Sequence, residues 1–257
     1  MQGTYLQIEK MQCLHIGSGE KVLFAFHGFG QTPNFVEVLA EKLPQYTIYS
    51  FDLLSFGKEP SKKEVLRLIN SFCKQYKITE FAILAFSIGG KMALSFLENC
   101  HQNISKVCLI APDGFKKHFF YEFAVSRFGK ILFWKFIKNP LFFIKLAKRL
   151  LPSSFSKELK IIEKYTQTPP KRFLLWRTWL ANRFLYPNHK KLHKIWEEQQ
   201  YPTQIWLAEN DLLAPIVAIH RFSKKHKSIH LKEIPTNHQK LLHEVFANRE
   251  FLNFFKP

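Results

Sequence analysis

Short apolar runs alternate with amphipathic stretches along the first part of the chain. Three runs rich in β-branched and aromatic residues are Lys21–Phe26, Tyr46–Phe51 and Phe81–Phe86. Between them, Asn34–Leu43 and Ser61–Tyr76 carry apolar residues at helical spacing, and the second begins with a Ser-x-x-Glu pattern typical of a helix N-terminus. Continuous apolar runs that alternate with helices are typical of a parallel sheet covered on both faces. The pattern therefore predicts an α/β fold.

The same alternation returns later in the chain. Further apolar runs predict the strands Lys106–Ala111, Thr203–Ala208 and Ile229–Ile234. A helix is expected over His238–Phe246, and the early segment Tyr5–His15 is expected to add one or two edge strands. We therefore expect a mostly parallel sheet whose strands come from both ends of the chain.

The segment between these two regions differs in composition. Residues Phe115–Gln200 hold 19 Lys and Arg against 5 Asp and Glu, which is +14 of the whole chain's +18, and 19 of its 40 aromatic residues. Basic residues recur at helical spacing through Phe123–Lys138 and Leu141–Leu151, and prolines divide the segment into about four helices. We expect residues 1–114 and 201–257 to form the core and residues 115–200 to form a basic, aromatic-rich helical insertion.

Composition restricts the class of protein. Hydrophobic residues make up 46% and charged residues 23% of the 257 positions, as in ordinary globular domains. The net charge of +18 indicates an anionic partner, although charge by itself does not distinguish nucleic acid, membrane and acidic substrates. The four cysteines lack the spacing of a zinc site or a disulfide framework. With no signal-peptide pattern and no apolar run of the roughly 18 residues that a membrane span needs, the expected location is the cytoplasm.

The most informative hexapeptide is Ala85-Phe-Ser-Ile-Gly-Gly90, at the junction between an apolar run and a helix. A serine at such a junction sits on a tight turn that lifts its hydroxyl clear of the sheet, and the positions two before and two after it must be small. Ala85 and Gly89 satisfy this condition around Ser87. A pattern this short also arises by chance, with the serine acting as a helix N-cap. It indicates a nucleophile only in combination with other residues.

A second element follows the apolar run Lys21–Phe26. The residues His27 to Gly30 stand where hydrolases of this topology form half of an oxyanion hole. The backbone N–H of Phe29 would act together with the N–H of Ile88, the residue after the serine, to stabilise a developing oxyanion. A turn that uses glycine for its positive φ explains the same residues without catalysis.

An acid and a histidine follow Ser87 along the chain. Asp211 lies just after a predicted strand, at the carboxyl end where open α/β sheets bind ligands. His238 lies just after the next predicted strand. The order Ser, Asp, His differs from the chymotrypsin and subtilisin orders and matches that of α/β hydrolases. Asp113 is an alternative acid, and His243 is a rival histidine that falls within the predicted helix.

Taken together, these segments resemble the α/β-hydrolase superfamily along nearly the whole chain. The resemblance is carried by the FHGFG segment, the AFSIGG turn, and the loops AENDLLAP and PTNH. It implies an eight-stranded, mostly parallel sheet with a helical cap inserted between the sixth and seventh strands, which matches the basic insertion. Two residues depart from the usual pattern: Ala85 and Asn237 stand where glycine is common, and neither carries a catalytic group.

The activity implied by the resemblance is that of a serine hydrolase acting on a carboxylic ester or thioester. Ser87 would attack the carbonyl carbon, His238 would accept the hydroxyl proton, and Asp211 would orient the histidine. The amides of Phe29 and Ile88 would form the oxyanion hole, and no metal or organic cofactor is required. The expected partner is a small-molecule acyl substrate, anionic or bound to a carrier, rather than nucleic acid.

Two other functions stay open. Lys91, one helical turn after Ser87, is similar to a substrate-binding basic residue of the menaquinone-pathway lyase succinyl-cyclohexadiene-carboxylate synthase, which implies a triad-based elimination. A solvated helix residue is the simpler interpretation of Lys91. The other function is that of a non-enzymatic binder that makes a peripheral contact with a membrane surface through the basic, aromatic insertion.

Overall fold

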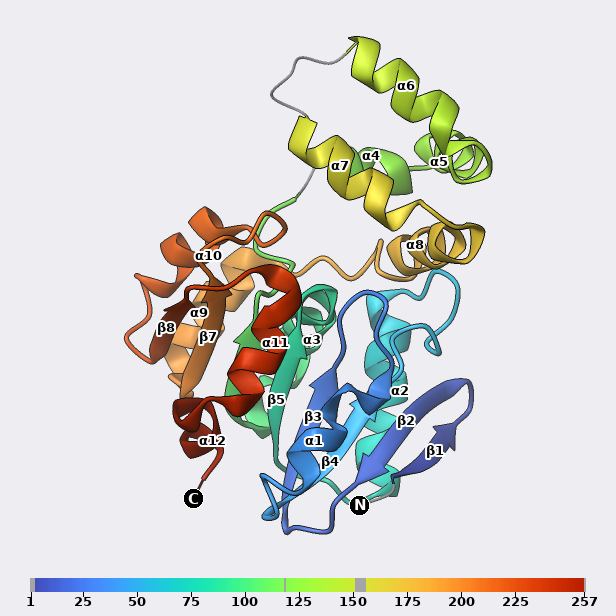
Figure 1. Cartoon of the computed structure of the whole chain (residues 1–257). Coiled ribbons are helices and arrows are strands. Elements are labelled where there is room, and N and C mark those ends of the chain that lie inside the picture. The colour runs from blue at the N-terminus through green and yellow to red at the C-terminus, as the bar shows by residue number, and fades with distance from the viewer. Residues whose placement is uncertain (1–2, 118, 151–155, 257) are drawn as a thin grey trace. The chain divides into compact units, whose positions relative to one another are not determined.

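In the computed structural model of the protein, which describes residues 3–117, 119–150 and 156–256, the chain forms an eight-stranded, mostly parallel sheet (Figure 1). The strands are β1 Thr4–Ile8, β2 Met11–Ile16, β3 Lys21–Phe26, β4 Tyr46–Phe51, β5 Phe81–Phe86, β6 Ile104–Ile110, β7 Thr203–Ala208 and β8 Ile229–Ile234. They lie in the order β1-β2-β4-β3-β5-β6-β7-β8. The β1–β2 and β2–β4 pairs are antiparallel and the other pairs are parallel. The predicted fold class is confirmed.

Helices cover both faces of the sheet because successive side chains of a strand point to opposite sides. In β3, Phe24 and Phe26 enter one core, whereas Leu23 and Ala25 enter the other. Helices α2, α3, α9 and α10 complete the first core, and α1, α11 and α12 complete the second. The helices around the sheet are η1 Pro33–Val36, α1 Glu37–Ala40, α2 Lys62–Gln75, α3 Ile88–Cys100, η2 His101–Asn103, α9 His189–Gln199, α10 Ile216–Ser223, α11 His238–Ala247 and α12 Arg249–Phe255.

The start of α2 illustrates how local sequence sets these boundaries. The Ser61 hydroxyl accepts a hydrogen bond from the backbone N–H of Glu64 at 3.2 Å, as the capping pattern indicated. The apolar residues that follow at helical spacing face the sheet, and Leu68 and Phe72 are fully buried. Polar residues occupy the opposite side of the helix, so α2 is amphipathic in the ordinary way.

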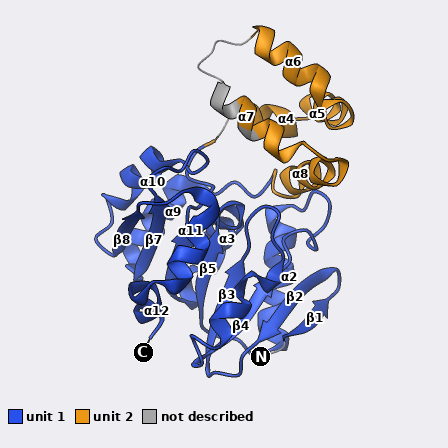
Figure 2. Cartoon of the chain, viewed as in Figure 1, with its two compact units in different colours: residues 1–116, 184–257 blue, residues 117–183 orange. Residues whose placement is uncertain are grey.

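The chain divides into two compact units (Figure 2). Unit 1 comprises residues 1–116 and 184–257, and unit 2 comprises residues 117–183. Unit 2 begins after β6 and ends before β7. The helical insertion therefore lies between the sixth and seventh strands, as expected. Helix α9, which the predicted boundaries 115–200 placed in the insertion, belongs to unit 1, where its residues Ile195 and Trp196 are buried in the first core.

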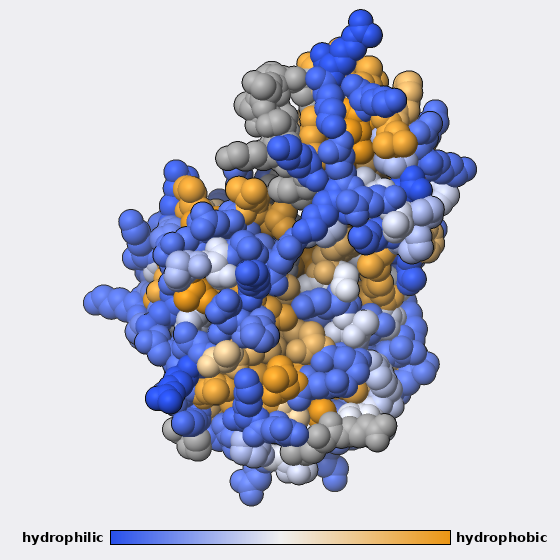
Figure 3. Space-filling view, viewed as in Figure 1, coloured by the Kyte–Doolittle hydropathy of each residue, from blue (hydrophilic) through white to orange (hydrophobic). Residues whose placement is uncertain are grey.

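Unit 2 is helical in its described residues. Its helices are α4 Phe119–Val125, α5 Gly129–Lys138, α6 Pro140–Leu150, α7 Ser156–Tyr165 and α8 Pro169–Ala181. In the view of Figure 3, hydrophobic side chains gather on the surface over α5 and α6 beside hydrophilic ones. Along the described parts of the chain, none of the helices combines the length and hydrophobicity that crossing a bilayer demands.

The helical pattern over Phe123–Lys138 is interrupted in the structure by the connection between α4 and α5. The chain breaks between α4 and α5, where the Ser126 hydroxyl accepts a hydrogen bond from the N–H of Gly129 at 3.0 Å. A Cβ atom at Gly129 would lie 1.8 Å from the carbonyl oxygen of Phe123, so only glycine fits this close approach. Pro140 begins a helix instead of only ending one, because the first helical position needs no backbone N–H.

Candidate active site

The turn between β5 and α3 holds Ser87 in a strained backbone conformation. Its φ of 52° and ψ of −121° lie in a region that residues with a side chain rarely adopt. Backbone hydrogen bonds fix the turn: the N–H of Ser87 donates to Ile110 O at 2.9 Å, and Ser87 O accepts from the N–H groups of Gly90 and Asp113 at 2.9 and 2.8 Å. A serine on such a turn presents its hydroxyl beyond the carboxyl end of the sheet.

Packing explains why a small residue follows Ser87 at the second position. A Cβ atom at Gly89 would lie 2.3 Å from the carbonyl oxygen of Phe26 and 2.6 Å from that of His27. Helix α3 therefore approaches the end of β3 as closely as backbone atoms allow. On the other side of the turn, the methyl group of Ala85 is fully buried within β5, where the usual pattern has glycine.

His238 links Ser87 to Asp211. Its Nε2 lies 3.1 Å from the Ser87 Oγ, and its Nδ1 lies 2.7 Å from the Asp211 Oδ2. When Nδ1 donates its proton to the carboxylate, Nε2 is left to accept the proton of the serine hydroxyl. The acid and the histidine meet because they follow β7 and β8, which are neighbours in the sheet. The three side chains that the sequence singled out form one chain of hydrogen bonds.

The Asp211 side chain is fully buried and its oxygens have specific partners. Oδ1 accepts hydrogen bonds from the N–H groups of Leu213 at 2.8 Å and Ala214 at 2.9 Å, while Oδ2 faces His238. Burial by itself raises the pKa of Asp211, but the His238 ring and the two backbone N–H groups outweigh it and lower the pKa below its ordinary value. The carboxylate therefore stays ionised at neutral pH.

The alternative acid Asp113 and the rival histidine His243 lie in different surroundings from Asp211 and His238. The Asp113 Oδ1 accepts a hydrogen bond from the N–H of Gly114 at 2.7 Å, within its own loop. His243 is exposed on the surface of α11. His238 is hydrogen-bonded to Asp211, so the geometry favours Asp211 over Asp113 as its carboxylate partner.

Two further residues adjoin His238: Asn237, noted in the sequence only as a departure from the usual glycine, and Phe86. The Asn237 Oδ1 accepts hydrogen bonds from the N–H groups of Gln239 at 3.1 Å and Lys240 at 3.2 Å, which caps α11 directly before His238. The ring of Phe86 lies 5.3 Å from the imidazole, measured between centroids. Asparagine before a helix is a recognisable capping signal, whereas the contact with Phe86 joins distant parts of the chain and has no local signal.

The loop after β3 is held by His27, which is buried. Its Nε2 accepts a hydrogen bond from the N–H of Leu53 at 3.2 Å, and its Nδ1 lies 2.9 Å from Gly28 O. A backbone N–H only donates and a carbonyl oxygen only accepts, so these two partners fit the tautomer that carries its proton on Nδ1. The N–H of Gly28 in turn donates to Gln31 Oε1 at 2.8 Å.

The two predicted oxyanion residues lie at the carboxyl ends of neighbouring strands. Phe29 follows Gly28 in the loop after β3, and Ile88 follows Ser87 at the start of α3, while β3 and β5 are paired in parallel. The first N–H groups of a helix have no acceptor within the helix, so Ile88 stands where an anion is readily stabilised. Their role in binding an oxyanion stays a prediction.

Lys91 is buried rather than solvated. It is 1% exposed, and its ammonium group lies 5.5 Å from the centroid of the Tyr186 ring. A cation beside an aromatic face is attracted by the ring quadrupole. The solvated interpretation of Lys91 is therefore wrong, and its role in binding a substrate stays a prediction.

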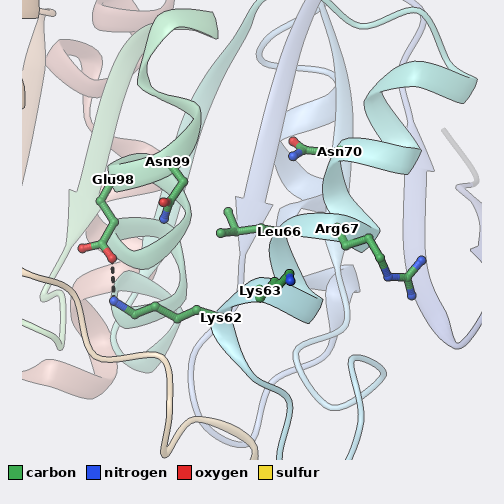
Figure 4. Close-up of a pocket in the computed structure, with 7 residues that line it drawn as sticks. All are labelled: Lys62, Lys63, Leu66, Arg67, Asn70, Glu98 and Asn99. Atoms are coloured by element: carbon green, nitrogen blue, oxygen red, sulfur yellow. Dashed lines mark hydrogen bonds and ion pairs between the residues drawn. The ribbon is translucent and has the colours of Figure 1, made fainter.

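A separate depression lies between α2 and α3 (Figure 4). Within it, the Lys62 Nζ pairs with the Glu98 Oε1 at 2.5 Å, and the Glu98 Oε2 accepts the N–H of Asn188 at 2.5 Å. The buried Glu98 therefore has a balanced charge and joins α2, α3 and the segment before α9. Over the residues that the structure describes, no group of three or more His, Cys, Asp or Glu side chains is arranged to hold a metal.

Comparison with known proteins gives the family. A family model described as alpha/beta hydrolase fold matches residues 21–256, while no curated protein matches the sequence. Similar solved structures include a thermophilic esterase from Thermogutta terrifontis, with 16% identity, a TM-score of 0.67 and full coverage (100%) of both chains. The haloalkane dehalogenase DbeA from Bradyrhizobium elkani has 13% identity and a TM-score of 0.63, covering 99% of this chain and 97% of that one.

A serine hydrolase from Cycloclasticus zankles is also similar, with 14% identity and a TM-score of 0.63, covering 98% of this chain and 97% of that one. At such identities the structural likeness concerns the fold alone, and the neighbours do not share one substrate. The match of the family model from the third strand almost to the end of the chain agrees with the eight-stranded sheet and its insertion. The chain belongs to the alpha/beta hydrolase fold family.

Proposed function

We propose that the protein is a serine hydrolase that cleaves a carboxylic ester or thioester. The observation that carries this proposal is the chain of hydrogen bonds Ser87–His238–Asp211, with distances of 3.1 and 2.7 Å. A serine on a strained turn, a histidine within reach of its hydroxyl, and a buried carboxylate that orients the histidine are the parts that acyl transfer through a covalent intermediate requires.

In the first half of the reaction, the Ser87 Oγ attacks the carbonyl carbon while the Nε2 of His238 takes the hydroxyl proton. The ionised Asp211 keeps a proton on Nδ1 and stabilises the imidazolium that forms. The carbonyl oxygen becomes an oxyanion, which the N–H groups of Phe29 and Ile88 stabilise by hydrogen bonding.

In the second half, the tetrahedral intermediate collapses and expels the alcohol or thiol, which takes the proton from the Nε2 of His238. Ser87 is then acylated. A water molecule attacks the acyl carbonyl and gives its proton to His238, and the second collapse releases the carboxylic acid and restores the serine hydroxyl. The same three side chains complete the cycle.

The residue type at position 87 favours acyl substrates over haloalkanes. Attack of a serine oxygen on a carbon–halogen bond would release halide and leave an alkyl ether on Ser87. An ether has no carbonyl carbon for water to attack, so the enzyme would stop after one event. An acyl-serine is an ester, which the same histidine-activated water hydrolyses.

A triad-based lyase is the alternative, with Lys91 holding an anionic substrate. This alternative has less support than hydrolysis, because the Lys91 side chain is 1% exposed and its ammonium group lies near the Tyr186 ring. It would predict elimination without an acyl-enzyme, so trapping of an acylated serine distinguishes the two reactions.

The test combines covalent labelling with a substrate series. A fluorophosphonate probe should label the wild-type protein at Ser87 and leave Ser87→Ala unlabelled, and p-nitrophenyl esters or acyl-thioesters should be hydrolysed. His238→Ala should abolish labelling, whereas His243→Ala, on the exposed face of the same helix, should keep it. Labelling at another residue, or halide release from haloalkanes without ester hydrolysis, would remove the proposal.

A further inference from the structure

Exposed apolar side chains are concentrated on unit 2. Among the described residues, 18 large apolar side chains are exposed, and 12 of them belong to this unit. Phe128, just before α5, is 81% exposed. Ile131 on α5 is 63% exposed, and Leu141 on α6 is 68% exposed. Soluble proteins rarely leave contiguous apolar surface of this kind in water unless it contacts another molecule.

Helix α6 is apolar on two sides. One side packs into unit 2: Ile144 is 5% exposed, and Phe143 beside it is half-buried. On another side, Phe142, Leu146 and Leu150 follow one another at intervals of four residues and form a stripe along the helix. They are 58%, 42% and 70% exposed. The packed side joins the helix to its unit, and the stripe lies outside that side, exposed for contact with a partner.

Basic residues accompany this apolar surface. Unit 2 holds 15 Lys and Arg against 3 Asp and Glu, and no acidic residue occurs from Phe123 to Lys157. On α6, Lys145 and Arg149 are exposed beside the stripe. Long basic side chains can lay their stems along apolar surface and hold their charges at its edge.

We propose that unit 2 docks on an anionic lipid bilayer through the exposed side chains of residues 128–150, called here the docking face. The free energy of binding becomes more favourable when apolar side chains enter the boundary between headgroups and acyl chains. It also becomes more favourable when basic side chains approach anionic headgroups. A single-stranded nucleic acid would use the charges and the aromatic rings, but it would gain little from the aliphatic residues Ile131, Leu146 and Leu150. The joint presence of both kinds of side chain favours the lipid surface.

The first experiment measures co-sedimentation of the full-length protein with vesicles. We expect binding to phosphatidylcholine vesicles that contain roughly a third phosphatidylserine, and at least tenfold weaker binding to phosphatidylcholine alone. Binding should fall steeply as the salt concentration rises from about 0.01 M to about 0.1 M, because the screening length shrinks about threefold. Absence of binding to the anionic vesicles at low salt, or equal binding to both compositions, would overturn the proposal.

The second experiment measures the contribution of the apolar side chains to vesicle binding. Phe142→Ser/Leu146→Ser should weaken vesicle binding about tenfold or more, because two apolar side chains no longer leave water. Its control is Val38→Ser/Val217→Ser in unit 1, where both residues are at least half exposed, and this variant should bind as the wild type does.

A matched pair of charge variants tests the basic residues. Lys145→Glu/Arg149→Glu should weaken binding at least tenfold, whereas Lys224→Glu/Lys227→Glu, which makes the same charge change at exposed positions of unit 1, should have a smaller effect. If the two charge variants weaken binding equally, the attraction belongs to the whole protein and the docking face is wrong.

Two other partners of the docking face, a single-stranded nucleic acid and a second copy of the chain, would give different results. If a single-stranded oligonucleotide competes with the vesicles and the Phe142→Ser/Leu146→Ser variant binds vesicles like the wild type, the surface is electrostatic and the proposal fails. If sedimentation velocity shows an oligomer that this variant dissociates, and vesicles are not bound, the face joins copies of the chain. Vesicle binding needs no substrate, so Ser87→Ala should bind normally and the outcome is independent of the proposed reaction.

Discussion

The two compact units treat their apolar side chains differently. Unit 1 has 190 residues with 23 Lys and Arg against 17 Asp and Glu, whereas unit 2 has 67 residues with 15 against 3. Although unit 1 is the larger, it holds only 6 of the 18 exposed large apolar side chains among the described residues. A sheet covered on both faces can bury nearly all of its apolar residues, which a few short helices around a small core cannot.

Helices α2 and α6 show the difference at the level of single elements. In α2, apolar residues such as Leu68 face the sheet and the opposite side is polar. In α6, Ile144 faces its own unit while Phe142 and Leu150 are exposed on another side. In our two proposals, unit 1 carries the reaction and unit 2 carries the contact with a membrane. The following predictions test that division.

The largest expected effect is a loss of ester hydrolysis without any loss of vesicle binding. Ser87→Ala should lower kcat for an activated ester by about a million-fold, as removal of the nucleophile does in subtilisin, and it should leave vesicle binding unchanged. Ester hydrolysis and vesicle sedimentation, measured on the same preparation, check both parts. Turnover that survives the substitution would place the reaction elsewhere in the molecule.

The next effect concerns the acid. Asp211→Asn should lower kcat by about ten-thousand-fold, as the corresponding change does in a serine protease, because the histidine would be held in the wrong tautomer. Asp113→Asn is the matched control, since Asp113 also follows a strand of the sheet but pairs with Gly114. If the control is the more damaging change, the assignment of the acid is wrong.

The comparison of the units extends to stability. Phe24→Ala removes a fully buried ring of unit 1 that lies 4.2 Å from the Phe81 ring between centroids. It should lower the free energy of unfolding by about 3–5 kcal/mol. Phe142→Ala, the same substitution at an exposed position of unit 2, should change it by less than about 0.5 kcal/mol. Urea unfolding measures both values, and similar losses would show that Phe142 is buried in the native protein.

A smaller effect is expected from ionic strength. We propose that the basic residues of unit 2 also attract an anionic or carrier-bound acyl substrate. Raising the salt concentration from about 0.01 M to about 0.1 M should then lower kcat/KM for an acidic acyl substrate severalfold and barely change it for a neutral short ester. Lys145→Glu/Arg149→Glu should reduce this difference. Equal salt dependence for both substrates would leave the charge without a role in substrate choice.

The smallest expected effect is a pH dependence of stability in unit 1. His193 and His226 face each other with Nδ1 and Nε2 2.8 Å apart, so one of these nitrogens carries no proton. Burial is the main cause that lowers the pKa of both histidines; Lys225 adds to it and Glu197 opposes it, while for His193 the charges of His226 and His189 add further.

Because these pKa values are lowered in the folded state, the unfolded state binds more protons in acid. The free energy of unfolding should therefore fall as the pH drops through the ordinary histidine value of about 6.5, with a slope below about 1.4 kcal/mol per pH unit for each group. Solvent screening of these partly exposed groups reduces the slope further. His193→Gln/His226→Gln should flatten the dependence in urea unfolding at about pH 7.5 and about pH 5.5. An unchanged slope would show that other groups cause it.

Local features could be predicted from residue patterns, whereas most contacts between distant segments could not. The exception is the chain Ser87–His238–Asp211, whose residues were identified through the family resemblance. The run Phe81–Phe86 is recognisable as a strand because a strand buried on both faces is apolar at every position. The break between α4 and α5 was missed because the apolar periodicity continues through Ser126, while the break depends on how closely Gly129 approaches Phe123. The burial of Lys91 was missed for the same reason, since Tyr186 is far along the chain.

The sequence by itself determined the strands, the strained turn at Ser87 and the order of the candidate residues, because hydrophobicity and turn preferences act between neighbouring positions. Only the tertiary structure decided which acid meets His238: Asp113 and Asp211 both follow strands, and the adjacency of β7 and β8 selects Asp211. It also decided which side of α6 faces inward. Phe142 and Phe143 are equally apolar, so periodicity cannot choose between them, and packing against the rest of unit 2 leaves Phe142 exposed.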